Sequence, residues 1–215
     1  MLSRVEAILF DLDGVLWLSD RVHAQAYARV LAENNLPLVD YQNFAGRRTD
    51  QVFRQLLGEK GHEPDAATIS HLTRQKQAYA MELLVHDPPI DPDAVRVVKA
   101  FSRRLQVALT SSASRAGVEL FLRASGLGGA FALVLHGEDV QRAKPDPEIY
   151  LLALNRLGIA ANKAVVVEDS VNGIQAAQQA GIPVIVRRST KSLDCVPRVG
   201  VYSVIDSLSE LLDAF

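Results

Sequence analysis

Two aspartates, Asp11 and Asp13, stand where an apolar run near the N-terminus ends. The run covers residues 5–10, is interrupted only by Glu6, and predicts a buried strand. Side chains two residues apart on an extended backbone project to the same side, so both carboxylates would face one site. Gly14 follows and permits a tight turn. Because a strand that runs into a solvated acidic turn has the same pattern, this pair gains meaning only from the rest of the chain.

Polar side chains also follow two other apolar runs and occupy one loop. They are Thr110, Ser111 and Ser112 after residues 107–109, Glu168 and Asp169 after residues 164–167, and Lys144 in the loop 141–147. Taken singly, such groups are usually turn formers, helix starts or charges beside helix dipoles. If the apolar runs are parallel strands, however, all of them meet at one edge, where four carboxylates would repel one another without a cation. A hard divalent ion with oxygen ligands removes that repulsion, and we expect Mg²⁺.

The elements that would carry these groups alternate along the second part of the chain. Strands are predicted at residues 107–109, 131–135, 164–167, 183–186 and 201–205, with helices at 94–103, before Gly126, before Gly158, before Gly181 and at 208–212. Residues 17 to 86 carry only helical patterns, among them one helix between Thr49 and Gly58 and another after Pro64.

This alternation predicts an α/β fold, a doubly wound parallel sheet with helices on both faces. The helical block interrupts the alternation after the first strand. We expect it to lie over the carboxyl ends of the strands, where such sheets bind ligands. The chain is therefore divided into an α/β core, residues 1–16 and 88–215, and an inserted α-helical domain, residues 17–87.

The composition narrows the classes of function. The chain has 215 residues, 48% of them hydrophobic, and a net charge of −2; this allows one sizeable core and gives no sign of binding to nucleic acid or a membrane surface. Its one cysteine, Cys195, excludes an intrachain disulfide, and the first apolar run is too short for a signal peptide. No apolar stretch approaches the roughly 20 residues that span a bilayer. We expect a cytoplasmic monomer or weak dimer.

The motifs resemble those of a known family. The stretches Asp11–Leu16, Ser111, Lys144–Pro147 and Val167–Ser170, the last followed by Gly173, are similar to the four motifs of the haloacid dehalogenase superfamily. The helical insertion directly after the first motif resembles the subfamily with a helical cap, which includes beta-phosphoglucomutase and many sugar-phosphate phosphatases. The resemblance covers nearly the whole chain.

The resemblance implies a role for each motif. Asp11 would be the nucleophile that takes the phosphoryl group, and Asp13 would be the general acid and then the base. Ser111 would bind a phosphoryl oxygen with Ser112 as a neighbouring substrate contact, and Lys144 would neutralise charge on the transferring group. The Mg²⁺ ligands that the resemblance implies are Asp11, the backbone carbonyl of Asp13, Asp169 and, directly or through water, Glu168.

The helical insertion would supply further substrate contacts. Arg47 and Arg48 follow Gly46 and could bind a second anionic group, although solvated surface arginines are nearly as common an outcome. His23 aligns with a histidine of the first cap helix in this subfamily; its alternative role is helix packing. The mutase has an arginine three residues after the glycine that matches Gly46. Because this chain has Thr49 there, a phosphatase is favoured over a mutase.

The expected function is therefore a Mg²⁺-dependent phosphatase. It would hydrolyse a small-molecule phosphate ester, expected to be a sugar phosphate, through an aspartyl-phosphate on Asp11. A phosphosugar mutase of the beta-phosphoglucomutase type is the alternative. Dehalogenases of the superfamily fit less well because they lack an aspartate at the position of Asp13, and phospho-receiver domains because they are shorter and lack the insertion. A binding protein with an inactive site would not keep every catalytic position filled.

Overall fold

The computed structural model describes residues 4–58, 65–188 and 200–214, and Cys195 lies outside them. Six strands form one parallel sheet in the order β3-β2-β1-β4-β5-β6. The strands are β1 (Ala7–Phe10), β2 (Gln106–Thr110), β3 (Leu133–Leu135), β4 (Ala164–Glu168), β5 (Val184–Arg187) and β6 (Val201–Ile205). The predicted α/β class with a parallel sheet is confirmed.

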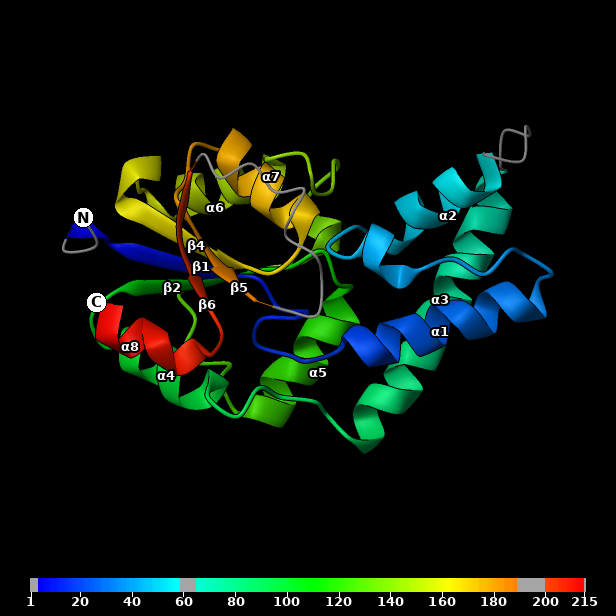
Figure 1. Cartoon of the computed structure of the whole chain (residues 1–215), viewed down its shortest axis with the longest axis horizontal. Coiled ribbons are helices and arrows are strands. Elements are labelled where there is room, and N and C mark those ends of the chain that lie inside the picture. Colours follow the sequence, from blue (N-terminus) through cyan, green and yellow to red (C-terminus); the bar gives the residue numbers. More distant parts are fainter. Residues whose placement is uncertain (1–3, 59–64, 189–199, 215) are drawn as a thin grey trace.

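Helices cover both faces of this sheet (Figure 1). They are α4 (Ala94–Phe101), α5 (Arg115–Ser125) and α8 (Leu211–Ala214) on one face and α6 (Glu148–Leu157) and α7 (Val171–Gln179) on the other. Short 3-10 turns lie at η3 (Gly137–Asp139), η4 (Ala161–Lys163) and η5 (Leu208–Glu210). The central strand is buried on both sides, because Ile8 and Phe10 join one apolar cluster while Ala7 and Leu9 join the other.

Several element ends follow from local sequence. Ser170 accepts a hydrogen bond from the Gly173 amide and so begins α7 as predicted. Gly126 and Gly158 take left-handed conformations directly after α5 and α6. The helix predicted at 94–103 is shorter and ends at Phe101, because the chain turns there to enter β2, with the Leu105 amide donating to the Phe101 carbonyl. The predicted strand 131–135 is likewise shorter and begins at Leu133, with the Ala132 amide donating to the Val107 carbonyl of β2 just before it.

Among the described residues between β1 and α4 all the regular elements are helices joined by turns and loops, as the sequence predicted. They are α1 (Asp20–Glu33), η2 (Tyr41–Phe44), α2 (Thr49–Gly58) and α3 (Ala66–His86), and residues 20–86 are called the helical insertion below. Figure 1 shows these helices beyond the carboxyl ends of the strands. The helical insertion has an apolar cluster of its own, which includes Tyr27, Phe53 and Leu72. Ala80 and Leu84 of α3 join the cluster of the sheet instead, so the helical insertion packs against the core.

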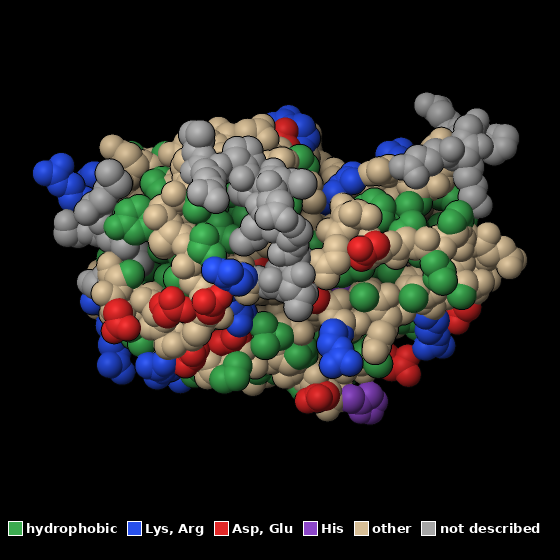
Figure 2. All heavy atoms as spheres, viewed as in Figure 1, with side chains coloured by type: hydrophobic (Ala, Val, Ile, Leu, Met, Phe, Trp, Pro, Cys, Tyr) green, Lys and Arg blue, Asp and Glu red, His purple; other side chains and the backbone are tan. Residues whose placement is uncertain are grey.

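The surface shows charges of both signs. Acidic and basic side chains are interspersed over the face seen in Figure 2. None of the described helices combines the length and the apolar character that crossing a lipid bilayer requires.

Candidate active site

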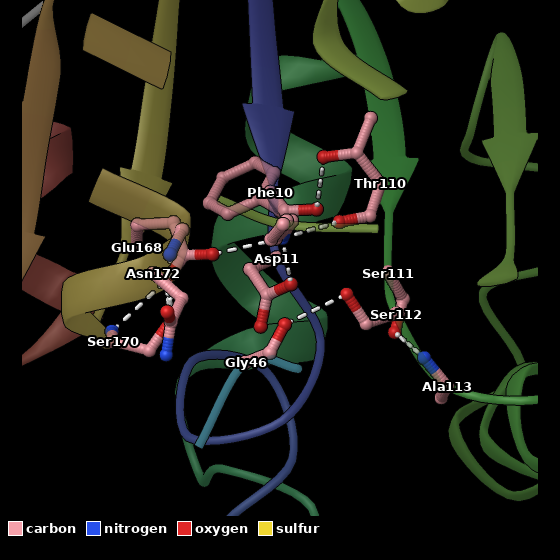
Figure 3. Close-up of polar contacts among 12 residues, drawn as sticks. Phe10, Asp11, Gly46, Thr110, Ser111, Ser112, Ala113, Glu168, Ser170 and Asn172 are labelled. Atoms are coloured by element: carbon pink, nitrogen blue, oxygen red, sulfur yellow. Dashed lines mark hydrogen bonds and ion pairs between the residues drawn. The ribbon is translucent and has the colours of Figure 1, made fainter. Parts of the chain in front are cut away.

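The sheet register brings three polar strand ends together. Phe10 of β1 pairs with Leu109 of β2 on one side and with Val167 of β4 on the other. The next residues along the three strands are Asp11, Thr110 and Glu168, and they therefore lie side by side at the carboxyl edge, as Figure 3 shows for Asp11. The Asp11 amide donates to the Val167 carbonyl at 3.0 Å, which fixes the backbone of Asp11 beside β4.

Lys144 is fully buried and bridges these strand ends. Its Nζ lies 2.6 Å from Asp11 Oδ1, 2.8 Å from Glu168 Oε1 and 3.2 Å from the Thr110 carbonyl oxygen. Burial alone would lower the pKa of the Lys144 ammonium, but the carboxylates of Asp11 and Glu168 raise it well above its ordinary value. Lys144 is therefore a fixed positive charge beside Asp11, the residue that the family resemblance assigns as nucleophile.

Asp11, Glu168 and Asp169 form a buried acidic group. One carboxylate oxygen from each lies within 4.8 Å of the others. Burial and the Glu168 carboxylate raise the pKa of Asp11 well above its ordinary value; Lys144 opposes them and Asp169 adds to them. A Cβ on Gly14 would come within 2.1 Å of Asp169 Oδ2, so only glycine fits under this carboxylate. Oxygen donors in a mutually repelling group suit a hard divalent cation, and the residues present therefore fit Mg²⁺.

Glu168 also anchors its surroundings. Its Oε2 accepts hydrogen bonds from the amides of Asp169 and Ser170 at 2.8 and 2.9 Å and from Ser170 Oγ at 3.0 Å. Its Oε1 faces Lys144 and accepts from the Tyr150 hydroxyl at 3.3 Å. A Cβ on Gly173 would lie 1.6 Å from Glu168 Oε1, so a glycine is required there as well. Glu168 thus holds Lys144 and the start of α7 in place.

The carboxylate of Asp13 takes a different direction from that acidic group. Asp13 Oδ1 accepts a hydrogen bond from Ser19 Oγ at 2.5 Å and lies 3.0 Å from His23 Nε2. Lys76 Nζ lies 3.0 Å from the other ring nitrogen of His23, so Lys76, His23 and Asp13 form a chain. Burial would raise the pKa of Asp13, but His23, Ser19 and Lys76 lower it to about 2. In this structure His23 therefore contacts Asp13, the candidate general acid and base.

The sequence reasoning missed Lys76. The helix expected after Pro64 is recognised from Ile69, Leu72, Tyr79 and Leu83, of which Leu83 is exposed while its neighbour Leu84 is buried. Lys76 is 5% exposed and continues the helical spacing from Leu72 to Ala80. A lysine on the apolar stripe of a helix was the available signal, because burying an ammonium requires a partner or a function.

Lys76 gives a prediction on stability. Burial lowers the pKa of its ammonium from 10.5 to about 8, with Asp13 opposing. Between those two pH values the unfolded chain binds more protons than the native protein, so the free energy of unfolding should rise with pH. Below this range Lys76 is charged in both states, and the native protein carries the full cost of burying the ammonium. The rise in the free energy of unfolding between about pH 8 and pH 10 should be roughly 1–3 kcal/mol in the wild type, and we expect it to be absent in Lys76→Met. Urea unfolding of both proteins between pH 7 and pH 10 measures it, with the exposed Lys163→Met as control. Parallel pH profiles for wild type and Lys76→Met would contradict the assignment.

The loop 45–48 of the helical insertion rests on the loop after β2 and on the first turn of α7. Ser112 Oγ donates to the Gly46 carbonyl at 2.8 Å (Figure 3), and Asn172 Nδ2 donates to the Ala45 carbonyl at 2.9 Å. Gly46 has a φ of +78°, and a Cβ there would lie 2.2 Å from Ser170 Oγ. Ser111 Oγ meanwhile accepts from the Ala113 amide at 3.0 Å. Ser112 thus contacts the helical insertion in this structure.

The two predicted substrate arginines have different surroundings. Arg48 forms a two-pronged ion pair with Asp50, at 2.7 and 2.8 Å, and donates to the carbonyls of Gly137 and Val140 at 3.2 and 3.0 Å. Its guanidinium therefore ties the helical insertion to the loop after β3. Arg47 donates to Gln55, and no carboxylate in the described part of the chain pairs with it. Of these two arginines, Arg47 is the one whose charge has no carboxylate partner among the described residues.

A cavity of about 440 Å³ lies between the helical insertion and the sheet edge. Its walls include Asp11, Asp13, Tyr41, Arg47, Thr73 and Lys76. The volume is in the range of small-molecule sites. Both aspartates and two cationic side chains of the helical insertion, Arg47 and Lys76, therefore line the same ligand space.

Fold and site together define an α/β protein with a buried acid–lysine centre under a helical insertion. The sequence matches known proteins of this kind: residues 5–181 match the haloacid dehalogenase-like hydrolases. The chain is 34% identical over 192 residues to the phosphorylated carbohydrates phosphatase of Thermotoga maritima, an alignment that spans 83% of this chain and 82% of that protein. The chain belongs to the haloacid dehalogenase-like hydrolase family.

Solved structures agree with this assignment. A variant of CbbY from Rhodobacter sphaeroides, in complex with xylulose-(1,5)bisphosphate, has a TM-score of 0.81 at 27% identity and covers 96% of both chains. The beta-phosphoglucomutase of Clostridium difficile has a TM-score of 0.81 at 21% identity, over 96% of this chain and 93% of that one. The second likeness concerns the fold alone.

Proposed function

We propose that this hydrolase is a Mg²⁺-dependent phosphatase that cleaves a small phosphorylated metabolite of the sugar-phosphate class through an aspartyl-phosphate on Asp11. The observation that carries the proposal is that Asp11, which lines a cavity of ligand size, contacts the buried Lys144 at 2.6 Å. The Thermotoga phosphatase and the bisphosphate-bound CbbY support the substrate class. In this proposal residues 17–87 act as the cap domain.

The acidic group would hold the metal. Asp11, Asp169 and the backbone carbonyl of Asp13 are the proposed ligands, with Glu168 beside them and bonded to Lys144. When bound, Mg²⁺ would lower the repulsion between a phosphate ester and these carboxylates and polarise the phosphoryl group.

Two displacements at phosphorus complete the reaction. A carboxylate oxygen of Asp11 attacks phosphorus, the bond to the ester oxygen breaks, and Asp13 gives its proton to the leaving oxygen. A water oxygen then attacks the same phosphorus, Asp13 takes the water proton, and the bond to Asp11 breaks to release phosphate. Lys144 offsets the charge on Asp11 in both steps, and Ser111 would bind a phosphoryl oxygen. In this structure Asp13 is held ionised, because His23, Ser19 and Lys76 lower its pKa to about 2 although burial opposes them. The proton that Asp13 gives in the first step must therefore be taken up from solvent or from the substrate phosphate as the ester binds. The ionised form is the one that the second step needs.

Phosphate release tests the proposal. Purified protein is mixed with Mg²⁺ and either p-nitrophenyl phosphate or a panel of phosphorylated metabolites, and phosphate and organic products are both quantified. Repeated turnover with free phosphate supports the phosphatase. Isomerised sugar phosphate without net phosphate release supports the mutase alternative, in which a sugar hydroxyl replaces water. No turnover with any ester would contradict both.

The unequal arginines give a prediction on specificity. Arg47→Ala should lower kcat/KM for the best substrate that carries a second anion by roughly ten- to a hundredfold, the loss of one charge-assisted contact. Hydrolysis of p-nitrophenyl phosphate, which lacks a remote anion, should change little. The measurement is the ratio of the two losses, and equal losses on both esters would contradict a substrate role for Arg47.

Arg48→Ala is the matched comparison. Because Arg48 bonds to the Gly137 and Val140 carbonyls, its removal should loosen the docked helical insertion and lower kcat/KM for both esters by a similar factor. A loss confined to the anionic substrate would instead return Arg48 to the role of substrate ligand.

A further inference from the structure

Arg187 is a buried arginine at the end of β5 that the reaction scheme does not use. Its Nη1 donates to the Gly14 carbonyl at 3.2 Å and to the Val15 carbonyl at 2.5 Å. Its Nη2 lies 2.5 Å from Asp91 Oδ2, and both side chains are almost fully buried. One guanidinium therefore contacts two segments that are far apart in the sequence.

These two segments are the connections between the sheet and the helical insertion. The Leu18 amide donates to the Pro89 carbonyl at 2.7 Å, and the Asp91 amide donates to the Leu16 carbonyl at 3.0 Å. The outgoing and returning chains thus run beside each other, and Arg187 bonds to both. Arg187 therefore joins the two connections at the point where the helical insertion leaves and re-enters the sheet domain.

The outgoing segment also carries Asp13. Amides of residues 15–17 all donate to the Leu12 carbonyl, and the Gly14 amide donates to the Trp17 carbonyl, so residues 12–17 form one tight turn. The Asp169 carboxylate lies close beside Gly14, with its Oδ2 2.1 Å from where a Cβ would be. Its carbonyl is held by Arg187. Arg187 therefore braces the turn directly after Asp13.

We propose that Arg187 is a positioning residue that holds the 12–17 turn so that Asp13 can protonate the leaving oxygen. The inference rests on the proposed function, because it takes Asp13 as the general acid. A planar guanidinium suits the task, since separate N–H groups reach two carbonyls and a carboxylate at fixed angles. The single ammonium of lysine cannot reproduce that fork, and a buried apolar side chain would leave the Asp91 carboxylate with the Asp93 amide but without its cation.

Displacement of Asp13 should change how kcat/KM depends on the leaving group, whereas partial unfolding should lower kcat/KM equally for all esters. Protonation matters most when the leaving oxygen is basic and little when it is a good leaving group such as p-nitrophenolate. kcat/KM reports the steps through the first phosphoryl transfer, where the leaving group departs. A displaced Asp13 should therefore slow phenyl phosphate much more than p-nitrophenyl phosphate.

The experiment compares both esters in wild type and Arg187→Met with Mg²⁺ present. We expect kcat/KM for phenyl phosphate to fall by roughly ten- to a hundredfold, the size of a misplaced catalytic group, and that for p-nitrophenyl phosphate by less than about threefold. The control is Arg188→Met, which removes the adjacent, exposed arginine paired with Asp206 and should leave both values within about twofold of wild type.

Arg187→Lys should show the same bias to a smaller degree, and it carries the comparison if Arg187→Met does not fold. Equal losses on both esters in the folded variant would overturn the proposal, since they would make Arg187 a structural residue only. Absence of turnover in the wild type with either ester is a different outcome, because it overturns the phosphatase itself.

Discussion

Asp11→Asn is expected to lower steady-state phosphate release by more than about a thousandfold, the scale on which removal of a nucleophile acts in other enzymes. The amide keeps the shape of the side chain but cannot form the aspartyl-phosphate. Lys144 then faces a neutral amide in place of one carboxylate and keeps Glu168 at 2.8 Å. Phosphate release in Mg²⁺ is the measurement, and activity within a few-fold of wild type would show that Asp11 is not the nucleophile.

The same variant should not be less stable than the wild type when metal is absent. Burial and neighbouring carboxylates raise the pKa of Asp11, so the native state binds more protons than the unfolded chain and loses stability as pH rises above about 4. Asparagine does not titrate, so this loss of stability with rising pH should be absent in Asp11→Asn. Urea unfolding in excess chelator measures it, with Glu6→Gln at the exposed opposite end of β1 as control. A markedly lower unfolding free energy for Asp11→Asn at pH 7 would contradict the raised pKa.

Removal of divalent metal is expected to lower turnover by more than about a hundredfold, and added Mg²⁺ should restore it. Asp11, Glu168 and Asp169 bring three buried carboxylates to one place, where an anionic ester would be repelled without a cation. Ca²⁺ should not restore activity, because it favours longer bonds and more ligands than Mg²⁺. The measurement is a titration of activity with each ion after chelation.

A stability readout separates metal binding from catalysis. Mg²⁺ should raise the melting temperature of the wild type, since an ion that binds only the native state stabilises it. Asp169→Asn should reduce that rise and increase the Mg²⁺ concentration for half-maximal activity. Full activity in excess chelator would overturn the metal proposal and favour the metal-independent dehalogenase alternative.

The sequence by itself determined the α/β class and the edge at which the polar groups gather. Apolar runs separated by helical spacing predict parallel strands, and residues that end such strands must meet at one edge whatever the details of packing. Asp11, Thr110 and Glu168 illustrate this, because each is simply the residue that ends or follows a strand. Local signals such as Ser170 before α7 were equally readable, since a cap acts within one helical turn.

Only the tertiary structure decided which partner each charged side chain has. Arg48 is a solvated or ligand-binding residue on sequence grounds, yet it bonds to carbonyls 89 and 92 residues away. Lys76 meets His23 from another helix, and Arg187 meets Gly14 from 173 residues away. Hydrophobic periodicity says which face of an element is buried, but not which element packs against it. The partner of a buried charge depends on that packing, because a guanidinium or ammonium taken out of water is stabilised by whichever acceptors the fold places within hydrogen-bond distance.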